Sequence, residues 1–445
     1  MTTHTRDPHA VAVRTLDLSH PLQALADVSD YAGVRLFVMW GDRPLGSVDI
    51  ANRHQPISEA RLCQAIVAKL TLKLLQEGLI QHFAPAGLIS STTSPATLPE
   101  NIPVSVVVAT YDRPDDLRNC LHCLVNQASP RSFEIIVVDN HSASGLTAAV
   151  VAEFPGVVLI DEPRQGLAYA RNTGFSASRG EIVIATDDDV TMPPGWLEKL
   201  VAPFINPDTM AVTGNILPLE LETAAQRLFE AYGGLGRGFE PLMVNGSWFR
   251  QFRSAVPTWK LGATANAAFR STIFSDPQIG LMDEGLGPGM PSGVGEDTYL
   301  FYKVLKAGHR IVYEPSAYLW HKHRRDLAAL RRQLYNYSKG HVAYHLTTLM
   351  RDQDLRALVH LGLRLPQYYL RRAKDRLRGR GDYPVSLILL EVAGSLAGPW
   401  ALWRSRRRVK REGHSVPYVP VTQRSNYEQR PPAAEMQQSM TVEVC

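Results

Sequence analysis

Apolar and amphipathic segments alternate along the middle of the chain. Four short runs rich in Val and Ile are almost wholly apolar, and between them the apolar positions recur at helical spacing. This order is typical of a parallel β-sheet with helices on both faces. The expected strands are 104–109, 134–139, 157–160 and 181–186, and the expected helices begin near Asp115, Ala148 and Leu167. We place this α/β domain at residues 103–325.

A smaller αβ module is expected before this domain. The strand-like runs "VRLFVMW" and "SVDIA" flank the turn sequence "GDRPLG", which predicts a β-hairpin, and apolar residues at helical spacing from Ser58 predict a helix. We assign residues 29–86 to this module and residues 1–28 to a flexible leader. The segment 87–102 is rich in Ser, Thr and Pro and is expected to be a linker.

The C-terminal part of the chain is basic and helical in pattern. Residues 324–412 hold 20 Lys and Arg against 7 Asp and Glu, whereas the whole chain has a net charge of only +4. We assign residues 326–412 to a basic helical region and residues 413–445 to a disordered tail. The excess positive charge suits an anionic membrane surface or a polyanionic glycan. Nucleic acid is not expected as a partner, because no recognised nucleic-acid motif accompanies the charge.

One long apolar run, residues 385–403, bears on location. It is near the length that spans a bilayer, but it contains Glu391 and Pro399, and a carboxylate near the bilayer centre is costly. A membrane span, an interfacial or re-entrant helix and a packed soluble helix all remain open, and the flanking arginines favour surface attachment. Residues 1–30 lack the pattern of a signal peptide. We therefore expect a cytoplasmic protein that residues 326–412 can hold peripherally at the inner face of the cell membrane.

The cysteine pattern points to a reducing compartment. Four cysteines are too few and too scattered for a disulfide framework. Cys120 and Cys123 form a CxxC pair, but the helix that carries them is expected to begin about a turn earlier, so its N-terminus cannot activate them as in a redox site. We expect both to be packing residues.

Polar residues follow three of the expected strands. Thr110 and Tyr111 follow the first, Asp139 ends the second, and the triplet Asp187–Asp189 follows the fourth. The carboxyl ends of parallel strands are where such sheets bind ligands. Three adjacent carboxylates raise one another's pKa unless a positive group lies among them. A metal ion would serve, and a solvated acidic turn before Pro193 is the alternative; the convergence of polar residues at one edge favours the metal.

Six segments together resemble the family 2 glycosyltransferases, which have the GT-A fold. They occur in the family's order and span residues 103–325. The resemblance implies a GT-A, Rossmann-like sheet that is parallel at its centre with helices on both faces, flanked here by the N-terminal αβ module and the C-terminal basic helices. The segments are "VSVVVATYDRPDDLRNCL", "EIIVVDN", "GLAYARNTGFSAS", "IVIATDDDVTMPPGWLEKL", "LGATANAAFRS" and "GEDTYLFYKVLKAGHRIVYEPSAYLWHKHRRD".

The resemblance implies a divalent metal at the triplet. By analogy with the family's DxD motif, Asp187 and Asp189 hold the metal and the ribose, with Asp188 as the central member. His321 resembles the family's third metal ligand, with His323 as the second choice, and a solvated histidine is the alternative for either. Carboxylate ligands suit Mg²⁺ or Mn²⁺, and an imidazole shifts the preference toward Mn²⁺.

The resemblance also implies a catalytic base and a donor site. An inverting sugar transfer needs a base for the acceptor hydroxyl, and Asp297 is the first choice and Glu296 the second, although both residues could simply favour a helix N-terminus. Ala109, Thr110 and Tyr111 resemble the loop that packs on the nucleobase and ribose. Further members of the implied site are Asp139 for the base imide, Arg171 for the diphosphate or base, and Asn266 on the acceptor side.

Two of these roles have alternatives. Arg171 could instead be a structural partner of Asp139 or Asp187. The segment around Asn266 has an extra Thr-Ala before the Asn, which departs from the usual family pattern.

The expected function is transfer of a sugar from a nucleotide-diphosphate-sugar donor to an acceptor hydroxyl, in the synthesis of a cell-surface glycan or glycoconjugate. Two other functions compete. A sugar nucleotidyltransferase would need a glycine-rich basic loop after the first strand, and "TYDRPDD" is acidic instead. A non-catalytic binding module on the same scaffold would be expected to lack the base or a metal ligand, and this sequence has candidates for both. The sugar, the nucleobase and the acceptor are not specified by any motif.

Overall fold

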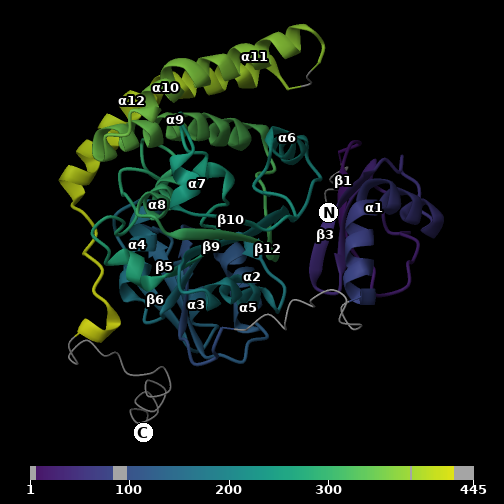
Figure 1. Cartoon of the computed structure of the whole chain (residues 1–445), viewed down its shortest axis with the longest axis horizontal. Helices are drawn as coiled ribbons and strands as arrows, with labels where there is room; N and C mark the ends of the chain where they lie inside the picture. The colour runs from purple at the N-terminus through teal and green to yellow at the C-terminus, as the bar shows by residue number, and fades with distance from the viewer. Residues whose placement is uncertain (1–6, 84–97, 381–382, 425–445) are drawn as a thin grey trace.

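The computed structural model of the chain describes residues 7–83, 98–380 and 383–424 and contains two β-sheets (Figure 1). A three-stranded sheet has the order β1-β2-β3, and a nine-stranded sheet has the order β10-β12-β9-β11-β7-β4-β5-β6, with β8 paired to β12. Helices cover both faces of the larger sheet, and further helices form a layer beyond it.

The larger sheet is parallel at its centre. Strands β7, β4, β5 and β6 run parallel, whereas β11 is antiparallel to both of its neighbours. Its strands are β4 (Val104–Thr110), β5 (Phe133–Asn140), β6 (Val157–Glu162), β7 (Ile182–Asp187), β8 (Val190–Thr191), β9 (Thr209–Pro218), β10 (Leu242–Val244), β11 (Asn266–Arg270) and β12 (Arg310–His321). The four strands expected from the apolar runs are all present.

Alternate residues of β4 contribute to two different cores. Val106 and Val108 pack with α2, α3 and α5, while Val107 and Ala109 pack with α4 and α8. Because both faces are covered, the strand has no polar alternation. The helices of this domain are α2 (Pro114–Val125), α3 (Leu146–Val151), α4 (Leu167–Ala177), α5 (Trp196–Val201), α6 (Ala224–Tyr232), α7 (Gly246–Arg250) and α8 (Glu296–Lys306).

The N-terminal module contains one strand more than expected. The predicted hairpin and helix are present as β2 (Gly33–Trp40), β3 (Arg43–Ile50) and α1 (Glu59–Phe83). The expectation of a flexible leader at residues 1–28 is wrong for β1 (Val11–Asp17), which pairs in parallel with β2. Its buried Ala12 joins the core of the module, and this burial stabilises a strand whose own sequence gives only a weak signal.

The N-terminal module packs directly against the larger domain (Figure 1). Phe37 and Met39 of β2 form a small core with Leu217 and Tyr318 of the larger sheet. Arg35 Nη1 also donates to Glu230 Oε2 in α6 at 2.8 Å. Residues 84–97, which hold most of the expected linker, lie outside the described residues.

The basic region forms a helical layer over the domain (Figure 1). Its elements are α9 (Leu327–Asp352), α10 (Arg356–Val359), the π-helix η4 (His360–Arg364), α11 (Leu365–Leu377) and α12 (Val385–Glu412). Gly394 and Gly398 allow α12 to lie close against α9, because a Cβ at either position would come within 2.6 Å of an α9 atom.

By length and composition alone, α12 could cross a membrane, and 39% of its apolar window is buried in the protein. Glu391 is 1% exposed and accepts hydrogen bonds from Arg372 at 2.6 Å and Tyr383 at 2.8 Å. Burial raises the pKa of this carboxyl, and the two partners oppose the rise. One face of α12 therefore packs against the rest of the protein.

The expected disordered tail is wrong over its first residues. The backbone N–H of Ser415 donates to Glu284 Oε1 at 2.8 Å, and the ring of Tyr418 is buried beside Phe274. These contacts hold residues 413–418 against the α/β domain. Residues 425–445 lie outside the described part of the chain.

Candidate functional site

The strand register brings the polar strand ends together at one edge of the large sheet. Ala109 lies opposite Asp187 on one side of β4, and Thr110 lies opposite Asp139 on the other. Parallel strands of matched length end at the same edge, so residues about 30 and 80 positions apart in the chain become neighbours. The Tyr111 ring is 49% exposed beside them.

Asp188 is the most enclosed member of the triplet. It is 3% exposed, and its carboxylate accepts from Thr110 Oγ1 at 2.8 Å and from Arg113 Nη1 at 3.0 Å. Burial raises the pKa of this carboxyl to about 7, with the Arg113 guanidinium acting against the rise. Asp188 therefore links Thr110 and Arg113 from a buried position in the site.

Asp189 has one paired and one unpaired oxygen. Its Oδ2 accepts from Arg113 Nη1 at 2.7 Å, while its buried Oδ1 has no hydrogen-bond partner among the described residues and lies 3.3 Å from His321 Nε2. Burial acts to raise the pKa of this carboxyl, but His321 and Arg113 outweigh it, so the pKa lies below its usual value. Asp189 is thus ionised, with one oxygen facing the imidazole.

Arg113 is a site residue that the sequence analysis missed. It precedes Pro114, the first residue of α2, and its guanidinium bridges two of the three aspartates. The signal for Arg113 that the sequence offered was a basic residue in the loop after the first strand of the α/β domain. It supplies a positive group of the kind that the triplet requires.

A chain of three side chains lies behind Asp189. His321 Nδ1 is 3.1 Å from His323 Nδ1, and His323 Nε2 is 3.0 Å from Glu230 Oε1. When Glu230 accepts the Nε2 proton of a neutral His323, the His323 Nδ1 lone pair accepts from His321 Nδ1–H. This arrangement leaves the lone pair of His321 Nε2 directed at Asp189. Burial lowers the pKa of His321, and the neighbouring Asp189 carboxylate opposes this fall.

Arg171 connects the triplet with the expected base. It is 1% exposed, donates to Asp187 Oδ1 at 2.6 Å and reaches Glu296 Oε1 at 3.4 Å. The ion pair between Arg171 and Asp187, which was the structural alternative for Arg171, is therefore present. Glu296 is also buried, and burial followed by the neighbouring Asp297 raises its pKa to about 8.

Asp297 is more accessible than Glu296. It lies in the first turn of α8, is partly exposed, and accepts from the backbone N–H of Thr298 at 2.6 Å and the Thr298 hydroxyl at 3.1 Å. These bonds orient the carboxylate without neutralising it. The structure thus distinguishes the two acids that the sequence could not separate: Glu296 is buried and contacts Arg171, and Asp297 is partly exposed.

The acceptor-side expectation for Asn266 needs correction. Asn266 is fully buried, its amide donates to the carbonyl oxygens of Asn215 and Ala317, and its Oδ1 accepts from Trp196 Nε1 at 2.9 Å. Both N–H groups of the amide and its Oδ1 atom are thus hydrogen-bonded within the protein. We therefore assign Asn266 a structural role at the start of β11.

The residues that could hold a metal ion are already close together. One ligand atom each of Asp187, Asp189 and His321 lies within 4.8 Å of the others. Within this group, Asp189 Oδ1 and His321 Nε2 lie 3.3 Å apart. Two carboxylate oxygens and one imidazole form a donor set that fits Mn²⁺ or Mg²⁺.

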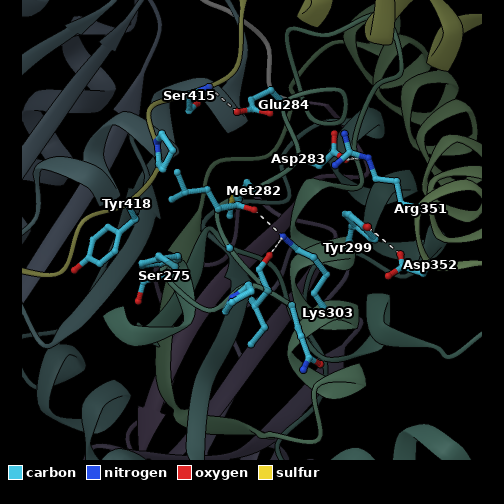
Figure 2. A pocket seen from close by; sticks show the side chains of 17 residues that line it. Ser275, Met282, Asp283, Glu284, Tyr299, Lys303, Arg351, Asp352, Ser415 and Tyr418 are labelled. Atoms are coloured by element: carbon cyan, nitrogen blue, oxygen red, sulfur yellow. Dashed lines mark hydrogen bonds and ion pairs between the residues drawn. The ribbon is translucent and has the colours of Figure 1, made fainter.

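A separate cavity of about 700 Å³ lies elsewhere in the domain (Figure 2). It contains none of the site residues above, and its charged groups are paired: Lys303 Nζ donates to the carbonyls of Ile279 and Leu281, and Asp283 binds Arg406. Tyr418 of the C-terminal segment lines it as well. These pairings indicate a structural junction rather than a second reaction site.

Residues 105–276 match the family model described as "Glycosyl transferase family 2". The pre-mycofactocin glycosyltransferase of Mycobacterium tuberculosis is 29% identical over 238 residues, which are 52% of this chain and 45% of that protein. Glycosyltransferase AglE of Haloferax volcanii is 33% identical over 119 residues, or 25% of this chain and 39% of that protein. The chain spans less than half of the length of these relatives.

Succinoglycan biosynthesis protein ExoM of Rhizobium meliloti is 25% identical over 258 residues, which cover 54% of this chain and 75% of that protein. A solved structure of mannosyltransferase PcManGT from Pyrobaculum calidifontis, in complex with GDP-Man and Mn²⁺, has a TM-score of 0.40 at 18% identity, with 82% of this chain and 90% of that chain covered.

The match to the family model includes the strand ends and the triplet, and it stops before Glu296, Asp297 and His321. The expected family and the expected fold are confirmed. Residues 105–276 are thus similar to glycosyl transferase family 2, and the parallel-centred sheet that they build is the one expected of the GT-A fold.

Proposed function

We propose that the chain is a metal-dependent, inverting glycosyltransferase that moves a sugar from a nucleotide-diphosphate-sugar donor to an acceptor hydroxyl. The observation that carries the proposal is the group Asp187, Asp189 and His321, which Arg171 links to the acidic start of α8. The names of the relatives, a succinoglycan biosynthesis protein among them, support a role in glycan synthesis.

The donor nucleotide is proposed to lie along the edge formed by β4, β5 and β7. The exposed ring of Tyr111 offers a stacking surface for the base, with Ala109 and Thr110 beside it, and Asp139 offers a carboxylate for a base N–H. Arg171 and Asp188 hold the inner side of this edge through the contacts to Asp187, Thr110 and Arg113. The diphosphate then lies next to the metal-binding group.

Asp187, Asp189 and His321 would hold Mn²⁺ or Mg²⁺. A bound divalent ion supplies positive charge next to the diphosphate, where negative charge grows as the glycosidic bond breaks. The Glu230–His323–His321 chain would keep His321 Nε2, and Arg113 would keep Asp189 Oδ1, available to such an ion.

Asp297 is the proposed base. Its carboxylate takes the proton of the acceptor hydroxyl while the hydroxyl oxygen attacks the anomeric carbon and the nucleotide diphosphate leaves from the opposite side. One displacement of this kind inverts the anomeric configuration. Glu296 is the second choice, because its carboxyl is buried and bound by Arg171.

The proposal is tested by calorimetry with UDP, GDP and dTDP, each with and without Mn²⁺. We expect one nucleotide to bind in a Mn²⁺-dependent manner to the wild type and not to Asp189→Ala. Asp115→Asn, whose side chain is 92% exposed, serves as the matched control and should bind as the wild type does. If the folded wild type binds none of the three under any metal condition, the donor site is refuted and a non-catalytic glycan-binding module becomes the better reading.

We further propose that α12 holds the protein at an anionic membrane surface. Leu389, Leu396, Trp400 and Trp403 are exposed along one stripe of the helix, at 64%, 78%, 62% and 44%, and Arg407 stacks on Trp403 at 4.7 Å. An apolar stripe that contains tryptophan and ends in arginines is typical of helices that lie in the lipid interface. The buried opposite face argues for surface attachment rather than a span.

Co-sedimentation with vesicles tests this attachment. We expect the protein to bind vesicles that contain phosphatidylserine, less so at high salt, and to lose binding in the double variant Trp400→Ala, Trp403→Ala. Leu72→Ala changes a similarly exposed residue, 77%, in the N-terminal module and should leave binding unchanged. Equal binding by the double variant and the wild type would exclude α12 as the attachment site.

A further inference from the structure

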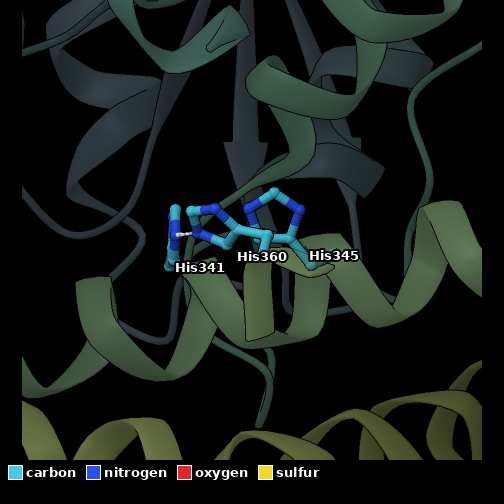
Figure 3. A group of neighbouring side chains, drawn as sticks. All are labelled: His341, His345 and His360. Carbon is cyan, nitrogen blue, oxygen red and sulfur yellow. Dashed lines mark hydrogen bonds between the residues drawn. The ribbon is translucent and has the colours of Figure 1, made fainter. Parts of the chain in front are cut away.

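Three histidines meet outside the site described above (Figure 3). His341 and His345 lie one turn apart on α9, and His360 is the first residue of the π-helix η4. Their ring centroids are 4.6 Å, 5.0 Å and 4.2 Å apart for the pairs 341–345, 341–360 and 345–360. The cluster therefore connects α9 with the helical segment that runs from α10 through η4 to α11.

The ring nitrogens are incompletely satisfied. His341 Nε2 and His360 Nε2 are 2.8 Å apart, so each uses the other as its partner. His345 is 2% exposed, and its Nε2 atom is buried without a hydrogen-bond partner in the part of the chain that the structure describes. A buried nitrogen without a partner is uncommon in native proteins and calls for a physical explanation.

We propose that His341, His345 and His360 form a binding site for Zn²⁺ or a similar first-row divalent ion. One ring nitrogen of each residue lies within 4.8 Å of the other two. Zinc binds imidazole nitrogens at about 2.0–2.1 Å, so the three rings need only small rotations to face one ion. Three protein ligands leave a fourth tetrahedral position for water. The ion gives the His345 nitrogen the partner that it lacks.

The surroundings of the cluster suit this chemistry. Burial lowers the pKa of His341 to about 3 and that of His360 to about 4, so the rings are neutral at physiological pH, as metal ligands must be. The Trp259 ring lies 5.1 Å, 5.8 Å and 5.9 Å from the three imidazoles and covers one side of the cluster. His341 and His360 are only partly buried, which leaves a path for an ion.

The π-helix η4 has a cause that does not involve a metal. Pro366 lies six residues after His360 and has no backbone N–H, which is a sufficient reason for irregular bonding in the turn before it. What matters is that this turn directs His360 toward α9. A purely aromatic packing cluster would give the same ring distances but would leave the His345 Nε2 atom unsatisfied.

A metal at this cluster would also brace the frame of the proposed reaction site. Gly340, next to His341, lies against the backbone of Val294, two residues before Glu296, where a Cβ would clash. The Tyr344 hydroxyl, one residue from His345, lies 3.1 Å from Thr258 Oγ1, which also contacts the Thr298 carbonyl. The two sites share no ligand, so the metal proposal stands independently of the proposed sugar transfer.

Zinc binding to the chelator-treated full chain tests the proposal. The Asp189→Asn background is used throughout, so that the other candidate metal group is weakened. We expect Zn²⁺ to bind at one site by calorimetry and to raise the melting temperature, and Co²⁺ to give the visible absorption of a tetrahedral site. Loss of a group that only orients a metal ligand lowers metal affinity by about 10–100-fold. Removal of a ligand itself, in His360→Gln, should therefore weaken Zn²⁺ binding by about 100-fold or more.

Two further variants keep the test decisive. His345→Phe fills the same space with an apolar ring, so it should stay folded by circular dichroism and yet lose the Co²⁺ absorption. His20→Gln changes a histidine whose side chain is 77% exposed, and it should bind Zn²⁺ as its background does. Zinc affinity and Co²⁺ absorption that are unchanged in both His360→Gln and His345→Phe would overturn the proposal, as would the absence of Zn²⁺ binding in the background protein.

Discussion

Replacement of Glu230 by Leu should weaken metal binding at Asp187, Asp189 and His321, although Glu230 belongs to α6 and touches none of the three. Its Oε1 atom is the acceptor for His323 Nε2 at 3.0 Å. Without that acceptor, the His323 proton can move to Nδ1 and be donated to His321 Nδ1. His321 then carries its proton on Nε2, which faces Asp189 at 3.3 Å, and the lone pair that would bind the ion is lost.

The expected size of the effect follows from the behaviour of groups that orient metal-binding histidines. Loss of such a group costs 10–100-fold in metal affinity, which is about 1.4–2.7 kcal/mol. Glu230→Gln keeps an oxygen that can accept from His323 and should lose less. Arg35→Met removes the 2.8 Å contact to Glu230 Oε2 but leaves the histidine chain intact, so it should bind the metal as the wild type does.

The assay is the fall in the electron paramagnetic resonance signal of free Mn²⁺ as protein is added. Asp189→Asn defines the signal that belongs to other sites and is subtracted. The reasoning predicts the order wild type and Arg35→Met, then Glu230→Gln, then Glu230→Leu, from tightest to weakest. Wild-type Mn²⁺ affinity in a folded Glu230→Leu protein would refute the assigned tautomers.

Three other predictions follow from the same structure. Asp297→Asn should lower kcat by about 10²–10⁴-fold with nucleotide binding retained, and Glu296→Gln by less; steady-state kinetics and calorimetry check both, and a larger loss in Glu296→Gln would reassign the base. Because the folded-state pKa of Glu296 is raised from 4.5 to about 8, its contribution to stability is complete below pH 4.5 and is lost as the pH rises through 8. Urea unfolding compared between pH 4.5 and pH 8 should therefore show a decline in the wild type that is smaller in Glu296→Gln. Gly214→Ala would push a Cβ into the carbonyl oxygen of Ala317 and should cost about 1–3 kcal/mol or more in thermal or urea unfolding. Gly78→Ala, in the open part of α1, should instead be neutral or stabilising by up to about 1 kcal/mol.

Local pattern was sufficient to predict the central part of the fold. The strands β4, β5, β6 and β7 are short apolar runs between helices, and a parallel sheet fixes which of their ends meet. The neighbours Asp187, Thr110 and Asp139 follow from that rule alone. Family resemblance was needed for His321 and for the acids at the start of α8, since no local rule connects residue 297 with residue 187.

The errors share a physical cause. Strand β1 pairs in parallel with residues 33–39, and its core is completed by residues far from it in the chain. Arg113 and Glu230 are ordinary surface-type residues in the sequence, and they act in the site only because the fold brings Asp188 and His323 to them. Asn266 matched a segment of the family pattern, but its amide is hydrogen-bonded to β9, β12 and Trp196. Contacts across long sequence separations decide all four.

The bridging position of Arg113 has a consequence for the order in which ligands bind. The three aspartates face the guanidiniums of Arg113 and Arg171, and Arg324 lies 3.9 Å from Asp189, so the opposing charges nearly cancel. A nearly neutral surface offers little attraction to a diphosphate. Arrival of a divalent cation would turn the same surface positive, so the nucleotide should bind after the metal or together with it, and metal affinity should rise when nucleotide is present. Arg113 would then be a residue that makes nucleotide binding depend on the metal.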